Sequence, residues 1–188
     1  MELLGWVVAG LFAPPGEALW QELQGGTLEE AFSELKGAPV ALPHPPPLPA
    51  LQEAYTALFV TNPQGVPAPP YAGYARDGVL LGPSYHALLE IYREGGLEVR
   101  ETWRDLPDHL AALGEAMALL APKRPDLAER LAREFLHPWL KRFGETVKAQ
   151  DATGFYAHAV DLLAEVIHAK TGVWTYAVLK IPDKMGLR

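Results

Sequence analysis

A proline, an aspartate and a histidine stand side by side at Pro107-Asp108-His109, directly before an apolar stretch that begins at Leu110. An aspartate there can accept hydrogen bonds from the free amides of a first helical turn, and the helix dipole favours its charge. On that interpretation Asp108 is a helix cap and His109 is a solvated first-turn residue. The same carboxylate could instead attract a cationic ligand, and these residues alone leave both interpretations open.

Acidic residues surround this segment. Between Glu90 and Glu115 the chain has seven acidic residues and three arginines, a local excess of four negative charges. An acidic edge beside apolar helix surface can receive a peptide that has a basic head and a hydrophobic body. Because runs of charge are also typical of solvated helix faces, the charge alone does not establish a binding site.

Several common reaction centres have no counterpart in the sequence. The chain has no cysteine, which excludes disulfides and thiolate chemistry, and it has no phosphate-binding glycine loop of the GxxxxGK[ST] kind. The patterns GxGxxG, GxSxG and HExxH are also absent from the sequence. We therefore predict that the protein is not an enzyme and has no catalytic residue, cofactor or metal site.

Charge and hydropathy indicate where the protein works. A net charge of −7 repels nucleic acids and anionic lipid surfaces. The apolar first twelve residues carry Glu2 where a signal peptide has basic residues, and Pro14-Pro15 ends the stretch, so we predict a buried helix. Since 18 consecutive apolar residues occur nowhere, we expect no insertion into a membrane and a cytoplasmic location.

The elements that would position these side chains are helices. Apolar residues recur at helical spacing in several segments, whereas strand-like alternation is not convincing anywhere. The segments with this spacing are 1–12, 48–59, 85–92, 110–120, 127–143 and 155–166. This pattern predicts an all-α helical bundle that forms a single domain over residues 1–188.

Proline interrupts one of these helical segments. Pro138 lacks an amide donor and would disrupt a continuous helix between Pro125 and Gly144, but proline is tolerated in a first helical turn. We favour two helices that meet near His137 over one kinked helix.

Two proline-rich stretches, 39–49 and 62–83, are predicted to be loops, and residues 181–188 a loose tail. The second loop contains Tyr71 and Tyr74, and a connection of that length is often a binding loop or a hinge. Long connections of this kind are also compatible with a homodimer that exchanges lobes.

The order of these motifs resembles the TorD/DmsD/NarJ family of redox-enzyme maturation chaperones, and most closely the TorD/DmsD branch. Four segments carry the resemblance: Tyr55-Thr-Ala-Leu-Phe-Val60; Pro69-Pro-Tyr-Ala-Gly-Tyr74 with Asp77-Gly78 and Leu81-Gly82; Tyr92 with Gly95-Gly-Leu97; and Leu106-Pro-Asp-His-Leu-Ala111 continuing to Leu120. The resemblance covers about residues 50 to 121, and the Pro-Asp-His segment is its most specific part.

The resemblance implies a fold of two helical lobes joined by a hinge at about residues 97–107. It also implies a function: binding the twin-arginine leader of a molybdopterin oxidoreductase precursor, assisting insertion of the cofactor and delaying export. The residues that match the family's leader-binding surface are Tyr71, Tyr74, Pro107, Asp108, His109 and Glu115.

Two other functions stay open at this point. A NarJ-like chaperone would assemble a nitrate-reductase-type enzyme at the inner face of the membrane. A nucleotide-binding or nucleotide-hydrolysing helical protein is less favoured, since the sequence has no phosphate-binding loop.

Overall fold

The computed structural model describes residues 1–178, and it describes the surroundings of side chains as far as Lys170. The tail predicted at 181–188 lies outside the described residues. Within them the fold is all-α, as predicted, and the one extended pairing is an isolated antiparallel bridge between Tyr71 and His109. In chain order the elements are α1 (Glu2–Phe12), α2 (Glu17–Gln24), α3 (Thr27–Lys36), α4 (Leu48–Tyr55), the π-helical turn η1 (Thr56–Val60), α5 (Ala72–Asp77), α6 (Pro83–Glu94), α7 (Leu110–Leu120), α8 (Pro125–Leu131), the π-helical turn η2 (Ala132–Leu136), α9 (His137–Gln150) and α10 (Phe155–Val178).

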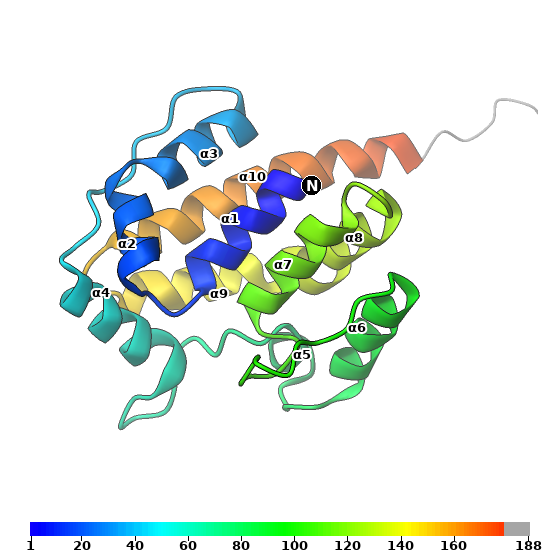
Figure 1. Cartoon of the computed structure of the whole chain (residues 1–188), viewed down its shortest axis with the longest axis horizontal. Coiled ribbons are helices and arrows are strands. Elements are labelled where there is room, and N and C mark those ends of the chain that lie inside the picture. The colour runs from blue at the N-terminus through cyan, green and yellow to red at the C-terminus, as the bar shows by residue number, and fades with distance from the viewer. Residues whose placement is uncertain (179–188) are drawn as a thin grey trace, which may run out of the picture.

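The core lies where α1 packs on α7 and α9 packs on α10, while α5 and α6 lie together at the edge of this body (Figure 1). One connected cluster of buried apolar side chains runs from Leu4 to Ile167. Residues 97–107 form the irregular connection between α6 and α7. The hinge that we expect in this segment stays a prediction.

The helices expected at 48–59, 85–92, 110–120 and 155–166 are present, although α10 continues to Val178. Gly95-Gly96 ends α6. The helices α2 and α3 are additional to the prediction, and α5 lies inside the stretch that we expected to be an irregular loop.

The segment around Pro138 combines the two structures that we considered. A new helix, α9, begins at His137 with Pro138 in its first turn, as favoured above. However, the π-helical turn η2 connects it to α8, and the backbone leaves regular helical geometry at Leu136, where φ is −121°. Pro138 is tolerated because its missing amide belongs to a first turn.

The length and composition of a helix decide whether it could cross a membrane. Among the described residues no single helix is long and apolar enough to cross a membrane, and α1 with α2 would qualify only as a pair bent by 120°.

Two glycines bring α1 and α7 into backbone contact. A Cβ atom added at Gly5 would lie 2.6 Å from the carbonyl oxygen of Gly114, and one added at Gly114 would lie 2.7 Å from the carbonyl oxygen of Gly5. Real Cβ atoms do not approach other atoms so closely. The helix axes can therefore stay this close only because both positions lack a side chain.

We expect Gly5→Ala to lower the free energy of unfolding by about 1 to 3 kcal/mol, because the methyl group would force the two helices apart. Gly10→Ala is the matched control in the same helix, since nothing lies within 4 Å of a Cβ atom there. The control should be neutral or stabilising by up to about 1 kcal/mol, because alanine favours helix more than glycine does. Urea denaturation of both variants measures the difference, and equal stability of the two would contradict the glycine contact.

Candidate peptide-binding site

The structure brings together the two segments that the sequence singled out. The amide of Ala72 donates to the carbonyl oxygen of Asp108 over 2.9 Å, and the amide of Leu110 donates to that of Pro70 over 2.8 Å. These two hydrogen bonds make the isolated bridge between Tyr71 and His109. Residues 69–74, the aromatic loop, are therefore fixed to the residues at the start of α7.

Asp108 is buried, with 1% of its surface exposed. Its Oδ2 atom accepts a hydrogen bond of 2.9 Å from the amide of Gly73, and its Oδ1 atom has no hydrogen-bond partner. A Cβ atom at Gly73 would lie 2.8 Å from that Oδ2 atom, so only glycine leaves room for the carboxylate. The interpretation of Asp108 as the cap of α7 is thus wrong, because this carboxylate binds the start of α5 instead.

The environment of Asp108 changes its acidity. Burial raises the pKa of this carboxyl above its ordinary value of 3.8, because the charged form loses water, while hydrogen bonds from the amides of Gly73 and of Asp108 itself act in the opposite direction. The nearby charge of Asp105 raises it further. Such a carboxylate is an internal connector and is not accessible to a ligand in the described structure.

His109 provides the cap of α7. Its Nδ1 atom accepts a hydrogen bond of 3.1 Å from the amide of Ala111, and only 3% of its surface is exposed. The expectation of a solvated histidine is therefore wrong. Burial lowers the pKa of His109, although the charge of Asp105 opposes this, so the ring is neutral and keeps Nδ1 as an acceptor.

The other expected residues have different environments. The hydroxyl of Tyr71 donates to Oδ1 of Asp105 over 3.0 Å, and burial together with this hydrogen bond raises the pKa of Tyr71 to about 12. The carbonyl oxygen of Pro107 accepts a hydrogen bond of 3.1 Å from the hydroxyl of Tyr92. Tyr74 is exposed on α5 and takes part in none of these hydrogen bonds.

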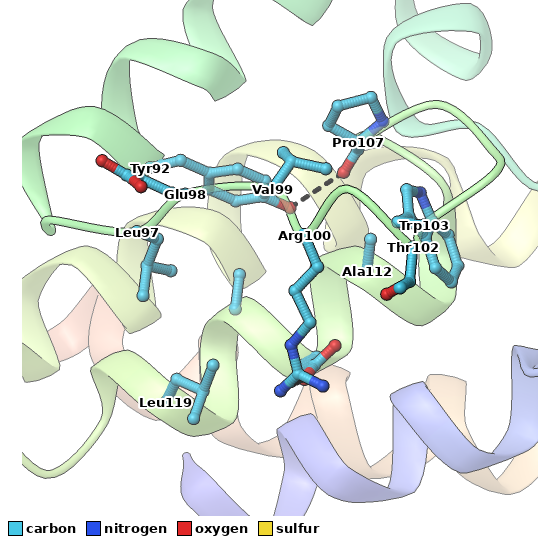
Figure 2. Close-up of a pocket in the computed structure, with 12 residues that line it drawn as sticks. Tyr92, Leu97, Glu98, Val99, Arg100, Thr102, Trp103, Pro107, Ala112 and Leu119 are labelled. Carbon is cyan, nitrogen blue, oxygen red and sulfur yellow. Dashed lines mark hydrogen bonds and ion pairs between the residues drawn. The ribbon is translucent and has the colours of Figure 1, made fainter.

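Glu115 lies on α7 and is already paired with a residue of the irregular connection. Its Oε1 atom lies 3.2 Å from Nη2 of Arg100. Figure 2 shows Arg100 extending from the connection toward α7. Arg100 and Glu115 are both among the residues that line a hollow of about 200 Å³. Tyr92, Leu97, Val99, Trp103, Ala112 and Leu119 are among the residues that line this hollow.

A larger groove, of about 480 Å³, shares Trp103 and Glu115 with this hollow. Its walls are mostly apolar and come from α1, α2, α3 and α7; they include Leu3, Trp6, Leu19, Leu23, Leu28, Ala31 and Ala111. In the part of the chain that the structure describes, Glu22 and Glu115 are the only charged residues that line it. Trp6 leaves 47% of its surface exposed here, so the groove offers a large apolar side chain to solvent.

A third hollow, also of about 480 Å³, lies where Pro14 and Pro15 face η1. Tyr55, Phe59, Tyr71, Asp105 and His109 are among its lining residues. His109 connects this hollow to the groove, because its ring contacts Tyr71 at 5.5 Å and Trp103 at 5.8 Å between ring centroids.

Sequence reasoning did not identify Trp6, Trp103 or Asp105 as site residues. An exposed tryptophan within an apolar helix gives no periodicity signal, and Asp105 was only one of seven acids. As regards other chemistry, no group of three or more potential metal-ligating side chains occurs in the part of the chain that the structure describes.

A sequence model of the family described as nitrate reductase delta subunit matches residues 17–146, more than half of the chain. The chain belongs to this family. The match includes the aromatic loop, the Pro107-Asp108-His109 segment and α7, so the resemblance proposed from the sequence is confirmed.

Two curated proteins from Salmonella are similar to part of the chain. A protein from Salmonella typhi named Tat proofreading chaperone DmsD is 34% identical over 97 residues, which are 50% of this chain and 47% of the relative. The protein of the same name from Salmonella typhimurium strain LT2 is 33% identical over the same shares. The chain thus spans about half the length of the curated relatives that it matches.

A solved structure from Archaeoglobus fulgidus, described as a redox enzyme maturation protein, has the same fold. It superposes with a TM-score of 0.64 and 20% sequence identity over 89% of this chain and 94% of that one.

The raised pKa of Asp108 predicts a pH dependence of stability. In the pH window above 3.8 and below the raised value, the folded chain binds more protons than the unfolded chain, so the free energy of unfolding falls as the pH rises through this window. Asp108→Asn removes this loss of stability at higher pH, because the amide does not ionise, and it keeps an oxygen that can accept a hydrogen bond from the amide of Gly73. We expect the substitution to be more favourable at about pH 7 than at about pH 4, as measured by urea denaturation. The same effect of the substitution at both pH values would contradict the raised pKa of Asp108.

Proposed function

We propose that the protein is a cytoplasmic, system-specific chaperone that binds the N-terminal twin-arginine leader of a molybdopterin oxidoreductase precursor. It assists cofactor insertion and delays export by holding the leader. It acts by stoichiometric binding and makes or breaks no covalent bond, so it is not an enzyme. The family membership and the names of the relatives from Salmonella support this class of function.

The observation that carries the proposal is the apolar groove between α1, α2, α3 and α7. A leader peptide combines a hydrophobic segment with arginines, and the groove offers an apolar surface with two acidic residues, Glu22 and Glu115, in its lining. An amphipathic or extended apolar peptide gains most of its affinity from burying such side chains in a groove of this kind. The net charge of −7 attracts a basic peptide over a longer range.

The expected site residues divide into two roles in this proposal. Tyr71 and Glu115 line hollows that a peptide would enter, although Glu115 is paired with Arg100, and Tyr74 is exposed on α5. Asp108 and His109 are buried, and Pro107 accepts from Tyr92. These three therefore position the aromatic loop and the start of α7, and they support the binding surface from beneath.

A second candidate function is a NarJ-like chaperone that assembles a nitrate-reductase-type enzyme. The description of the matching family, nitrate reductase delta subunit, favours it. The two candidates differ in the client. A tagged protein recovered from extract of its native cells should retain a molybdopterin oxidoreductase, and the N-terminus of that enzyme decides between them: a full twin-arginine leader favours the first and a degenerate one the second.

Trp6→Ala should weaken binding of the client's leader peptide by about 2 kcal/mol, roughly thirtyfold in Kd, because a tryptophan in a groove is a typical hot spot. Isothermal titration calorimetry with the synthetic leader measures this change. Leu80→Ala is the control, since Leu80 is 52% exposed and lies outside the groove lining. If both variants bind as tightly as the unaltered protein, the groove is not the leader site.

A further inference from the structure

The acidic residues near α7 differ in whether they already form an ion pair with an arginine. Glu90 is paired with Arg93, Glu94 with Arg124, and Glu115 with Arg100. The carboxylate of Asp108 is buried against Gly73. Asp105, in contrast, is exposed and forms no ion pair with any residue that the structure describes.

The carboxylate of Asp105 is held in place but keeps one oxygen free. Its Oδ1 atom accepts from the hydroxyl of Tyr71 at 3.0 Å and from the amide of Leu106 at 2.6 Å. No described residue donates a hydrogen bond to its Oδ2 atom. A fixed carboxylate with a free oxygen binds a cation without first losing its own side-chain freedom.

This carboxylate belongs to a hollow with aromatic walls, the third hollow described above, of about 480 Å³. Tyr55 and Phe59 are buried and pack edge to face at 5.3 Å, and the ring of Tyr71 is on the same lining. Among the residues that the structure describes, no lysine or arginine lines the hollow, and its one histidine, His109, is neutral because burial lowers its pKa. Within that part of the chain, Asp105 is therefore the only charged group of the hollow.

The negative charge of Asp105 affects the pKa values of the tyrosines in the hollow. Burial is the main cause that raises the pKa of Tyr55, and the charge of Asp105 is the next. The pKa of Tyr71 is raised by burial and then by its hydrogen bond to Asp105. A cation in this hollow would meet the exposed carboxylate of Asp105 with the partly buried ring of Tyr71 beside it.

We propose that this hollow is a binding subsite for an arginine side chain, with Asp105 as its anion and Tyr55, Phe59 and Tyr71 as its walls. The subsite rests on the leader-binding function proposed above, and it receives an arginine of the leader while the groove receives the apolar segment. The two hollows adjoin across the ring of His109, which contacts Tyr71 on one side and Trp103 on the other. A guanidinium suits this hollow better than an ammonium, because it is planar, stacks on aromatic rings and is more weakly hydrated.

The test compares two peptides and three proteins. The peptides are the leader with its arginine pair and the same leader with citrulline, the uncharged isostere, at both arginines. The proteins are the unaltered chain, Asp105→Asn, which keeps an oxygen acceptor for Tyr71 and Leu106, and Glu101→Gln. Glu101 is the matched control because it is exposed, close in sequence and without an ion pair in the described part of the chain.

We expect Asp105→Asn to bind the arginine leader about tenfold more weakly and the citrulline leader with unchanged affinity, while Glu101→Gln binds both as the unaltered chain does. If Asp105→Asn leaves the affinity for the arginine leader unchanged while Trp6→Ala still lowers it, the subsite is refuted and the leader-binding function stands.

A small probe decides the subsite independently of the leader. N-acetylarginine amide is titrated into the isotope-labelled protein, and the amide shifts of Val60 and Tyr71, which line the hollow, are followed by NMR. Saturable shifts that disappear in Asp105→Asn and with N-acetylcitrulline amide support the subsite. Their absence in the unaltered chain refutes it, and failure of the unaltered chain to bind any leader peptide refutes the leader-binding function instead.

Discussion

Backbone contact between α1 and α7 is the constraint on which the rest of the structure depends. Because Gly5 and Gly114 have no side chains, the two helices pack at a distance that no other pair of residues would allow. One face of α1 packs in this contact, while Trp6 and Leu3 of the same helix line the groove with α2 and α3. The same contact fixes α7, whose Ala111 and Glu115 complete the groove. A packing requirement of the core thus also determines the shape of the candidate binding surface.

A second set of contacts holds the aromatic loop against this core. It is made by Asp108 and His109, the residues that look most reactive in the sequence. The carboxylate of Asp108 accepts from Gly73 at the start of α5, and the imidazole of His109 accepts from Ala111 at the start of α7. One carboxylate oxygen stays without a partner in the interior, which costs free energy. This cost arises where α5, α7 and the aromatic loop meet. Asp108 and His109 therefore fix the loop from the interior, and the exposed residues around them are the ones that can contact a ligand.

The sequence predicted those parts of the fold that depend on local patterns. Apolar spacing was sufficient for the existence of α4, α6, α7 and α10, and proline chemistry was sufficient for the start of α9. The helix α2 escaped prediction because it buries no residue fully, and α5 because it has only six residues. The role of Asp108 could not be read from the sequence either, since its partner Gly73 lies 35 positions away. The groove is likewise a product of packing between four helices and has no local signal.

The arrangement of the two proposed subsites explains how a chaperone with a plain apolar groove could still select one class of peptide. An apolar groove accepts many hydrophobic segments, and a single carboxylate accepts many cations, so neither discriminates well by itself. The buried ring of His109 sets the groove and the Asp105 hollow at a fixed separation, because it contacts Trp103 on one side and Tyr71 on the other. A peptide gains both interactions only when its arginine and its apolar segment follow each other at the matching spacing. Because the binding energy depends on this order of residues, it favours a leader over an arbitrary hydrophobic or basic peptide. This selectivity requires that Trp103, Asp105 and His109 stay in place while the peptide is bound.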